Sequence, residues 1–117
     1  MAEKAITVRY GKGIQRTVPQ ASTPWTRMKG LIGASSESAA DGLLLWECPR
    51  IHTHWMQFAL DVLYLDGDGI VLAQENDIPP GRVGMHVYGA RHVLEIPAGT
   101  WAREVRIGER LIVDTGV

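Results

Sequence analysis

Short runs of apolar residues, separated by turns, fill the first fifth of the chain. Residues 5–10 contain the β-branched run Ile-Thr-Val, and residues 14–18 resume the apolar pattern after the link Gly-Lys-Gly. β-Branched residues on both sides of a short glycine-containing link are typical of a β-hairpin. We therefore predict that residues 5–10 and 14–18 are paired strands.

A helix is predicted over Pro24 to Ile32. Thr23 is a favourable N-cap residue, and Pro24 follows at the first helical position, where its missing N–H costs nothing. The apolar residues then recur at helical spacing and predict one buried stripe, made of Trp25, Met28, Leu31 and Ile32. Gly33 is expected to end the helix in the left-handed conformation.

The rest of the chain predicts mostly strands. The expected strands are residues 42–46, 51–56, 60–66, 69–74, 92–96 and 110–114, with a tight Asp-Gly-Asp-Gly turn between the third and fourth of these. Residues 76–82 are expected to be a loop, and residues 101–106 a short helix. The fold class is therefore predicted as α+β, with an antiparallel-rich β-sheet or a partly closed barrel, one full helix and one short helix.

The composition of the chain excludes several classes of protein. With 117 residues the chain, residues 1–117, is expected to form a single domain. The net charge of −1 supplies little attraction for nucleic acid, so a nucleic-acid partner is not expected. Cys48 is the single cysteine, which excludes an internal disulfide and a C-x-x-C metal or redox pair.

No apolar run reaches the length of about 20 residues that spans a bilayer. The N-terminal residues also lack an apolar run of signal-peptide length. The expected location is therefore cytoplasmic, or outside the cytoplasm if a leader was removed before this sequence begins.

Two acids stand inside apolar strands. Asp61 shares a strand face with Leu63, and a carboxylate among leucines needs a cationic or hydrogen-bonding partner. The interpretation we favour is a structural anchor tied to a loop or an arginine; the alternative is acid–base or ligand-binding work. Glu95 is either a surface residue opposite Lys or Arg, or the partner of Asp61 in an acid–base pair that Arg27 orients.

Two further patterns are weaker indications of chemistry. His52 and His54 lie on one face of a predicted strand, but no third ligand stands at a diagnostic spacing, so no metal site and no cofactor are predicted. The four tryptophans are expected to anchor the core and its rim. No nucleophile elbow surrounds any serine, which argues against a serine hydrolase.

Five motifs in order resemble one known family: W-T-R-M-K-G-L at 25–31, G-L-L-L at 42–45, I-H-T-H-W-M-Q-F-A-L-D-V-L-Y-L-D at 51–66, G-I-V at 69–71 and V-L-E-I-P-A-G at 93–99. The chain is similar to the bacterial and archaeal family called domain of unknown function 192, over about residues 23–111. The resemblance implies a small α+β fold and a prokaryotic source, but no activity. Many of the relatives are exported behind a leader.

The resemblance also marks particular positions. The residues that match the family motifs are Arg27, Gly30, Met56, Asp61 and Glu95. The chain departs from the family at His54, where an aromatic residue is usual, and at Ala59, where proline is frequent. The first departure argues against a metal site as a trait of the family.

These observations lead to three hypotheses for function. The first is a binding module for a small ligand or a peptide, with a polar cleft made of Arg27, His54, Asp61 and Glu95 around Met56 and Trp55. The second is a small enzyme that uses Asp61 and Glu95 as general acid and base. The third is an interaction domain in which the same residues form a buried ion-pair network. The sequence does not indicate the oligomeric state.

Overall fold

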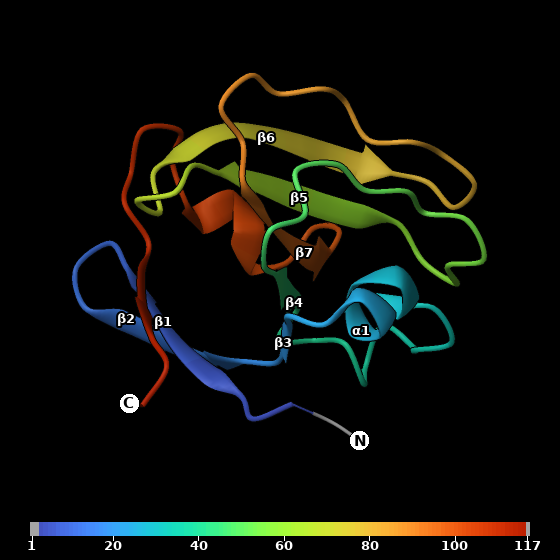
Figure 1. Ribbon diagram of the computed structural model, residues 1–117, viewed down its shortest axis with the longest axis horizontal. Coiled ribbons are helices and arrows are strands. Elements are labelled where there is room, and N and C mark those ends of the chain that lie inside the picture. Colours follow the sequence, from blue (N-terminus) through green and yellow to red (C-terminus); the bar gives the residue numbers. More distant parts are fainter. Residues whose placement is uncertain (1–2, 117) are drawn as a thin grey trace.

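The computed structural model describes residues 3–116, and its strands form two β-sheets (Figure 1). The elements in chain order are β1 (Ile6–Tyr10), β2 (Ile14–Val18), β3 (Gln20–Ala21), α1 (Pro24–Lys29), β4 (Leu43–Leu45), β5 (Leu60–Leu65), β6 (Val71–Ile78), β7 (His92–Pro97), the 3₁₀ helix η1 (Trp101–Glu104) and β8 (Ile112–Asp114). The predicted α+β class with mainly antiparallel strands is confirmed. The described strands do not close into a barrel.

The first sheet has the order β2-β1-β8. β1 and β2 pair in antiparallel register from Ile6 opposite Val18 to Tyr10 opposite Ile14, as the predicted hairpin requires. Gly11 and Gly13 in the turn both have positive φ, which glycine adopts without steric cost. β8 then pairs with the other edge of β1, so the end of the chain completes a sheet that its beginning started.

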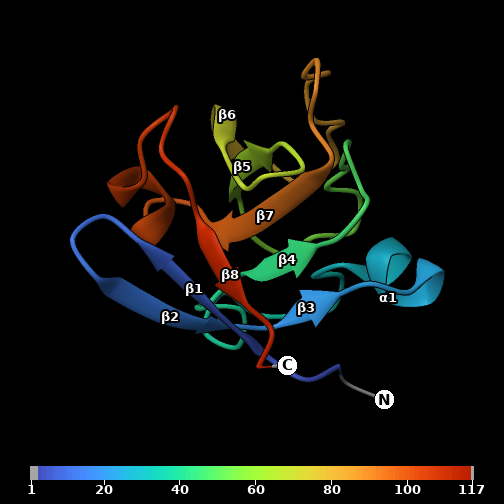
Figure 2. The same cartoon turned by 60° about the vertical axis from the view of Figure 1, so that its left-hand side comes forward.

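The second sheet has the order β3-β4-β7-β5-β6, and its strands are antiparallel except that β3 and β4 are parallel. β3 was not predicted from the sequence, because two residues after Pro19 are too few to show a periodic pattern. β3 follows β2 directly and carries the chain from the first sheet to the second. Figure 2 shows β5, β6 and β7 of the second sheet above β1 and β2 of the first, with β3 continuing from β2 along the bottom of the view.

The second sheet buries both of its faces. Along β5, Leu63 and Leu65 pack in a cluster with residues of the first sheet. The alternate residues Leu60, Val62 and Tyr64 pack on the opposite face, where the cluster also contains residues of the loops outside the sheet. All six residues of β5 and all six of β7 are buried, so a polar side chain in either strand needs a partner inside the protein.

The predicted strand at 51–56 is wrong. This segment makes a single β-bridge, between His52 and Val83, and Trp55 has a φ of 64° that a strand does not allow. The buried Thr53 instead ties the segment to a neighbouring loop, since its hydroxyl donates to the carbonyl of Pro79 at 2.6 Å and accepts from the N–H of Arg82. Residues 51–56 are therefore a loop that covers the second sheet.

The helix α1 starts where predicted but ends early. The hydroxyl of Thr23 accepts from the N–H of Thr26, and the Thr26 hydroxyl accepts from the N–H of Thr23 in return. The helix ends at Lys29, because Gly30 has a φ of 50° and a ψ of −129°. The buried apolar stripe is largely wrong: Trp25 and Met28 are 68% and 60% exposed.

The strand β6 extends through part of the predicted loop at 76–82. A register shift separates Leu60 opposite Ile78 from Val62 opposite Glu75, so β6 holds one more residue than β5 in this stretch. Asp77 takes up the extra length with a φ of 56°.

The short helix near 101–106 is confirmed as η1. Neither α1 nor η1 has the length and the apolar character that crossing a lipid bilayer requires.

Candidate functional site

A cavity of about 290 Å³ lies on the face of the second sheet that carries α1 and the following loops. It is lined by Arg27, Met28, Lys29, Gly30, Leu31, Ile32, Leu45, Cys48, Arg50, Ile51, His52, Met56 and Glu95. Its volume is at the lower end of the range of about 300–1,000 Å³ for small-molecule sites. We refer to it as the Glu95 cavity.

Glu95 is a buried acid in the middle of β7. Its side chain is 4% exposed, and its Oε1 atom has no hydrogen-bond partner among the described residues. Burial raises the pKa of Glu95 from its usual 4.5 to about 8. At neutral pH the side chain is therefore mainly an uncharged carboxylic acid, which both donates and accepts a hydrogen bond. The alternative that Glu95 is a surface residue opposite Lys or Arg is wrong.

The sheet register places Glu95 in the cavity. Glu95 lies opposite Val62 of β5 and Leu43 of β4, and residues directly opposite one another in antiparallel strands share a face. Gly30 lies over the carboxyl: a Cβ atom at Gly30 would stand 3.4 Å from Glu95 Oε1. The short helix and its glycine end therefore cover the acid without filling the space beside it.

The charged groups around the cavity, apart from Glu95, are cationic. Arg27 is half-buried, and its Nη1 donates to the carbonyl of Trp46 at 3.2 Å. Lys29 and Arg50 are exposed at the rim. The thiol of Cys48 donates to the carbonyl of Arg50 at 3.2 Å, and burial raises its pKa, so it is present as an unreactive thiol at neutral pH.

Asp61 does not belong to this cavity. It lies opposite Ile96, whereas Glu95 lies opposite Val62, so the two acids are on opposite faces of the second sheet. The predicted acid–base pair of Asp61 and Glu95 is therefore wrong. A guanidinium does pair with an acid of β5, but it comes from Arg103 in η1 and not from Arg27.

Asp61 is instead a structural anchor, the interpretation the sequence favoured. Its side chain is fully buried and accepts from the N–H groups of Asp77 and Gly99, each at 2.9 Å, and from Arg103 Nε at 2.9 Å. Burial alone would raise the pKa of Asp61, but these bonds together outweigh burial and hold it below its usual value. The anchor ties the bulge of β6 and the turn after β7 to η1.

The structure brings together Arg27, Met56 and Glu95 of the predicted cleft. His54 and Trp55 are exposed, and Trp55 is 78% exposed; neither lines the Glu95 cavity. His52, whose ring lies 5.3 Å from that of His54, lines it instead. Within residues 3–116 no three His, Cys, Asp or Glu side chains gather in a way that would hold a metal ion.

Five further residues that line the cavity were not predicted from the sequence, namely Leu31, Leu45, Cys48, Arg50 and Ile51. Leu31, Leu45 and Ile51 lie inside the family motifs but carry no chemical signal there, and Cys48 and Arg50 lie outside the motifs. Of the four tryptophans, only Trp101 is buried, at 3% exposure, and Trp46 is partly buried. The expectation that all four anchor the core or its rim is wrong for Trp25 and Trp55.

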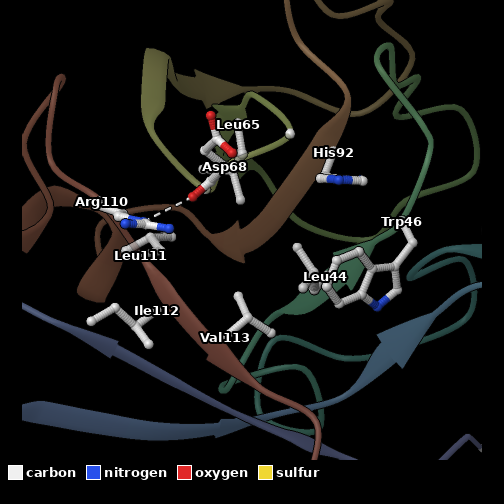
Figure 3. A pocket seen from close by; sticks show the side chains of 11 residues that line it. Leu44, Trp46, Leu65, Asp68, His92, Arg110, Leu111, Ile112 and Val113 are labelled. Carbon is white, nitrogen blue, oxygen red and sulfur yellow. Dashed lines mark hydrogen bonds between the residues drawn. The ribbon is translucent and has the colours of Figure 1, made fainter.

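A second cavity, of about 420 Å³, opens where strands of both sheets meet, with His92 and Trp46 on one side and Arg110 on the other (Figure 3). Two of its polar side chains are bonded within the protein: Arg110 Nε donates to the carbonyl of Asp68, and His92 Nδ1 accepts from the N–H of Glu47. Among residues 3–116, the buried side-chain N and O atoms without a partner belong to Arg9, Glu95 and Trp101, and none of these three residues lines it. The Glu95 cavity is therefore the better candidate.

We expect Gly30→Ala to destabilise the protein by about 1–3 kcal/mol, because its backbone angles strain any residue with a Cβ. The added methyl group also contacts Glu95 and buries it further, so the ¹³C NMR titration of the Glu95 carboxyl should move to higher pH.

Gly33→Ala is the matched control. Gly33 also has a positive φ, of 84°, but a Cβ there meets nothing within 4 Å. The Gly33→Ala variant should lose stability, but the pH at which the Glu95 carboxyl titrates should not change. An equal movement in both variants would contradict the contact between Gly30 and Glu95.

The fold and the site define a small α+β domain in which a helix and loops enclose one acid against a β-sheet. The chain belongs to the DUF192 family, described as Uncharacterized ACR, whose model matches residues 6–113. This span is wider than the 23–111 that the motifs indicated. No curated protein matches the chain.

Two solved structures share the fold. A protein of Sinorhizobium meliloti 1021, described as a candidate transcription regulator, is similar with a TM-score of 0.82 and 24% identity, over 97% of this chain and 96% of that one. A protein of unknown function from Novosphingobium aromaticivorans DSM 12444 is similar with a TM-score of 0.75 and 20% identity, over 92% of this chain and 83% of that one. At these identities the likeness extends to the fold alone.

Proposed function

We propose that this protein is a binding module whose Glu95 cavity takes a small ligand. One observation carries the proposal: Glu95 is 4% exposed, its Oε1 atom has no hydrogen-bond partner among residues 3–116, and it lines an open cavity. An unsatisfied buried polar atom costs about 1–3 kcal/mol, and a bound ligand that supplies its hydrogen bond removes that cost. The cavity volume of about 290 Å³ favours a small molecule over a peptide segment.

The other two hypotheses have less support. An enzyme that uses Asp61 and Glu95 together would need both acids beside one substrate, and they lie on opposite faces of the sheet. An interaction domain without a cleft would need both acids sealed; Asp61 is fully buried and bonded, but Glu95 lines a cavity. A polar group inside an apolar cavity is the usual arrangement of a small-molecule site.

A screen of small amino acids, organic acids, amines and nucleosides by thermal shift tests the proposal. A compound that binds the folded protein at 100 times its Kd should add about 2.7 kcal/mol to the free energy of unfolding. Glu95→Leu replaces the carboxyl with an apolar side chain of similar size. The variant should fold, but the compound should no longer stabilise it. The control, Glu47→Leu, changes a carboxylate outside the cavity that is 54% exposed, and should keep the stabilisation.

Two results would contradict the proposal. One is a screen in which no compound stabilises the wild-type protein. The other is a compound that stabilises Glu95→Leu as much as the wild type, since its site would then lie elsewhere.

A further inference from the structure

We infer that the ligand of the Glu95 cavity is a small organic acid, with its carboxylate between Glu95 and the cationic rim and its apolar body against the inner wall. The inference rests on the proposed function and names the class of ligand. It follows from the charges of the cavity, the hydrogen bond that Glu95 offers and the side chains that form the wall.

The charges favour an anion. Three cationic side chains line the cavity, those of Arg27, Lys29 and Arg50, and Glu95 is the one acid among its lining residues. At neutral pH Glu95 is mainly uncharged, because burial raises its pKa to about 8. The cavity is therefore net positive at neutral pH, and a ligand of positive charge is repelled. The remaining titratable groups near Glu95 are Cys48, a thiol, and His52, which line the cavity, and Tyr64 on the same face of the sheet, whose pKa is raised by burial and further by the Glu95 charge.

The hydrogen-bonding group of Glu95 favours an acceptor. A protonated carboxyl has one O–H to donate, and a carboxylate oxygen of a ligand is a strong acceptor for it. A ligand ammonium group would instead need the ionised form of Glu95, which burial disfavours. Among residues 3–116, the Arg27 side chain bonds only through Nη1, to the carbonyls of Ser22 and Trp46, so its other guanidinium nitrogens can add a second contact to the carboxylate.

The inner wall favours an apolar body. Leu31, Leu45, Ile51 and Met56 line the cavity and are each 8% exposed or less. Met28 extends the apolar lining towards the surface, because its side chain is 60% exposed. An aliphatic or aromatic chain behind the ligand carboxylate would cover the apolar wall. Binding would then remove apolar surface of both the wall and the ligand from water, which favours binding.

Three probes of one length separate the classes of ligand: hexanoate, hexanamide and hexylammonium. Their affinities for the wild-type protein are measured by titration of amide NMR signals at pH 6.5 and at pH 9. We expect hexanoate to bind tightest at pH 6.5. Its affinity should fall by about tenfold at pH 9, because about one molecule in ten then keeps the proton on Glu95.

Two variants identify the groups responsible. Glu95→Gln keeps an uncharged donor at the same place, so it should still bind hexanoate but without the loss at pH 9. The double variant Lys29→Gln/Arg50→Gln removes two rim charges and should weaken hexanoate several-fold while hexanamide is unchanged. Both rim residues are exposed, so this variant should fold normally.

The outcomes separate the inference from the proposed function. Tighter binding of hexylammonium, or equal binding of hexanamide and hexanoate, overturns the organic-acid inference but leaves a ligand site at Glu95. Hexanoate binding that survives in Glu95→Leu also overturns the inference, because the carboxylate then binds elsewhere. If none of the three probes binds and the broader screen also finds no ligand, the proposed function fails together with the inference.

Discussion

Replacing Glu95 with glutamine is expected to remove most of a pH dependence of stability. The pKa of Glu95 is about 8 in the folded protein and near its usual 4.5 in the unfolded chain. Between these values the folded state binds more protons, so the free energy of unfolding falls as the pH rises, by about 1.4 kcal/mol per pH unit. From pH 5 to pH 8 the wild-type protein should lose about 3 kcal/mol through this group.

Urea unfolding at pH 5 and pH 8 measures the effect. The glutamine in Glu95→Gln is uncharged at both pH values. The free energy of unfolding of this variant should therefore be close to that of the wild type at pH 5 and about 3 kcal/mol higher than that of the wild type at pH 8. The control Glu47→Gln alters an ion pair with Arg91 in which both side chains are more than half exposed, and should change stability by less than about 1 kcal/mol. A wild-type protein as stable at pH 8 as at pH 5 would mean that Glu95 ionises freely.

Replacing Asp61 with asparagine should destabilise the protein by about 3 kcal/mol. The carboxylate is fully buried and accepts two backbone N–H bonds as well as the Arg103 pair. Asparagine has one acceptor oxygen and brings an NH₂ group against these donors, so at least one buried donor loses its partner. Since Arg103 is 43% exposed, water replaces part of what it loses, and the cost stays near the lower end for a broken buried pair.

A matched control is available on the same arginine. Asp77 accepts from Arg103 Nη2 at 2.7 Å, but its side chain is 70% exposed, so Asp77→Asn should cost less than about 1 kcal/mol. The pKa of Asp61 is lowered by folding, so its contribution should be present above its usual value of 3.8 and be lost as the pH falls below that. Thermal melts at pH 7 compare the stability lost in Asp61→Asn with that lost in Asp77→Asn. Equal losses would contradict the role of Asp61 as an anchor.

Elements with strong local signals could be predicted from the sequence. The hairpin of β1 and β2 needs only a turn and β-branched residues, and the start of α1 needs only the cap at Thr23 and the proline after it. Residues 51–56 were mistaken for a strand because their apolar residues resemble one. Their true shape depends on Thr53, whose partners Pro79 and Arg82 are far along the chain.

The site was predictable only in part, for a related reason. Side-chain alternation assigns residues to faces within one strand, but it does not say which face of a neighbour they share. That depends on the register, and the register sets Glu95 beside Val62 and on the opposite face from Asp61. The cavity cations come from two segments, Arg27 and Lys29 from α1 and Arg50 from the loop after β4, so they form no single run that the sequence could reveal.

The separation of the two acids by the thickness of a sheet has an evolutionary consequence. Asp61 anchors η1 on one face of the second sheet, and Glu95 lies in its cavity on the other face. Substitutions at sites that share no partners combine almost independently. Residues around the cavity, such as Cys48, can therefore change without weakening the contacts at Asp61, so the binding site can evolve separately from the scaffold.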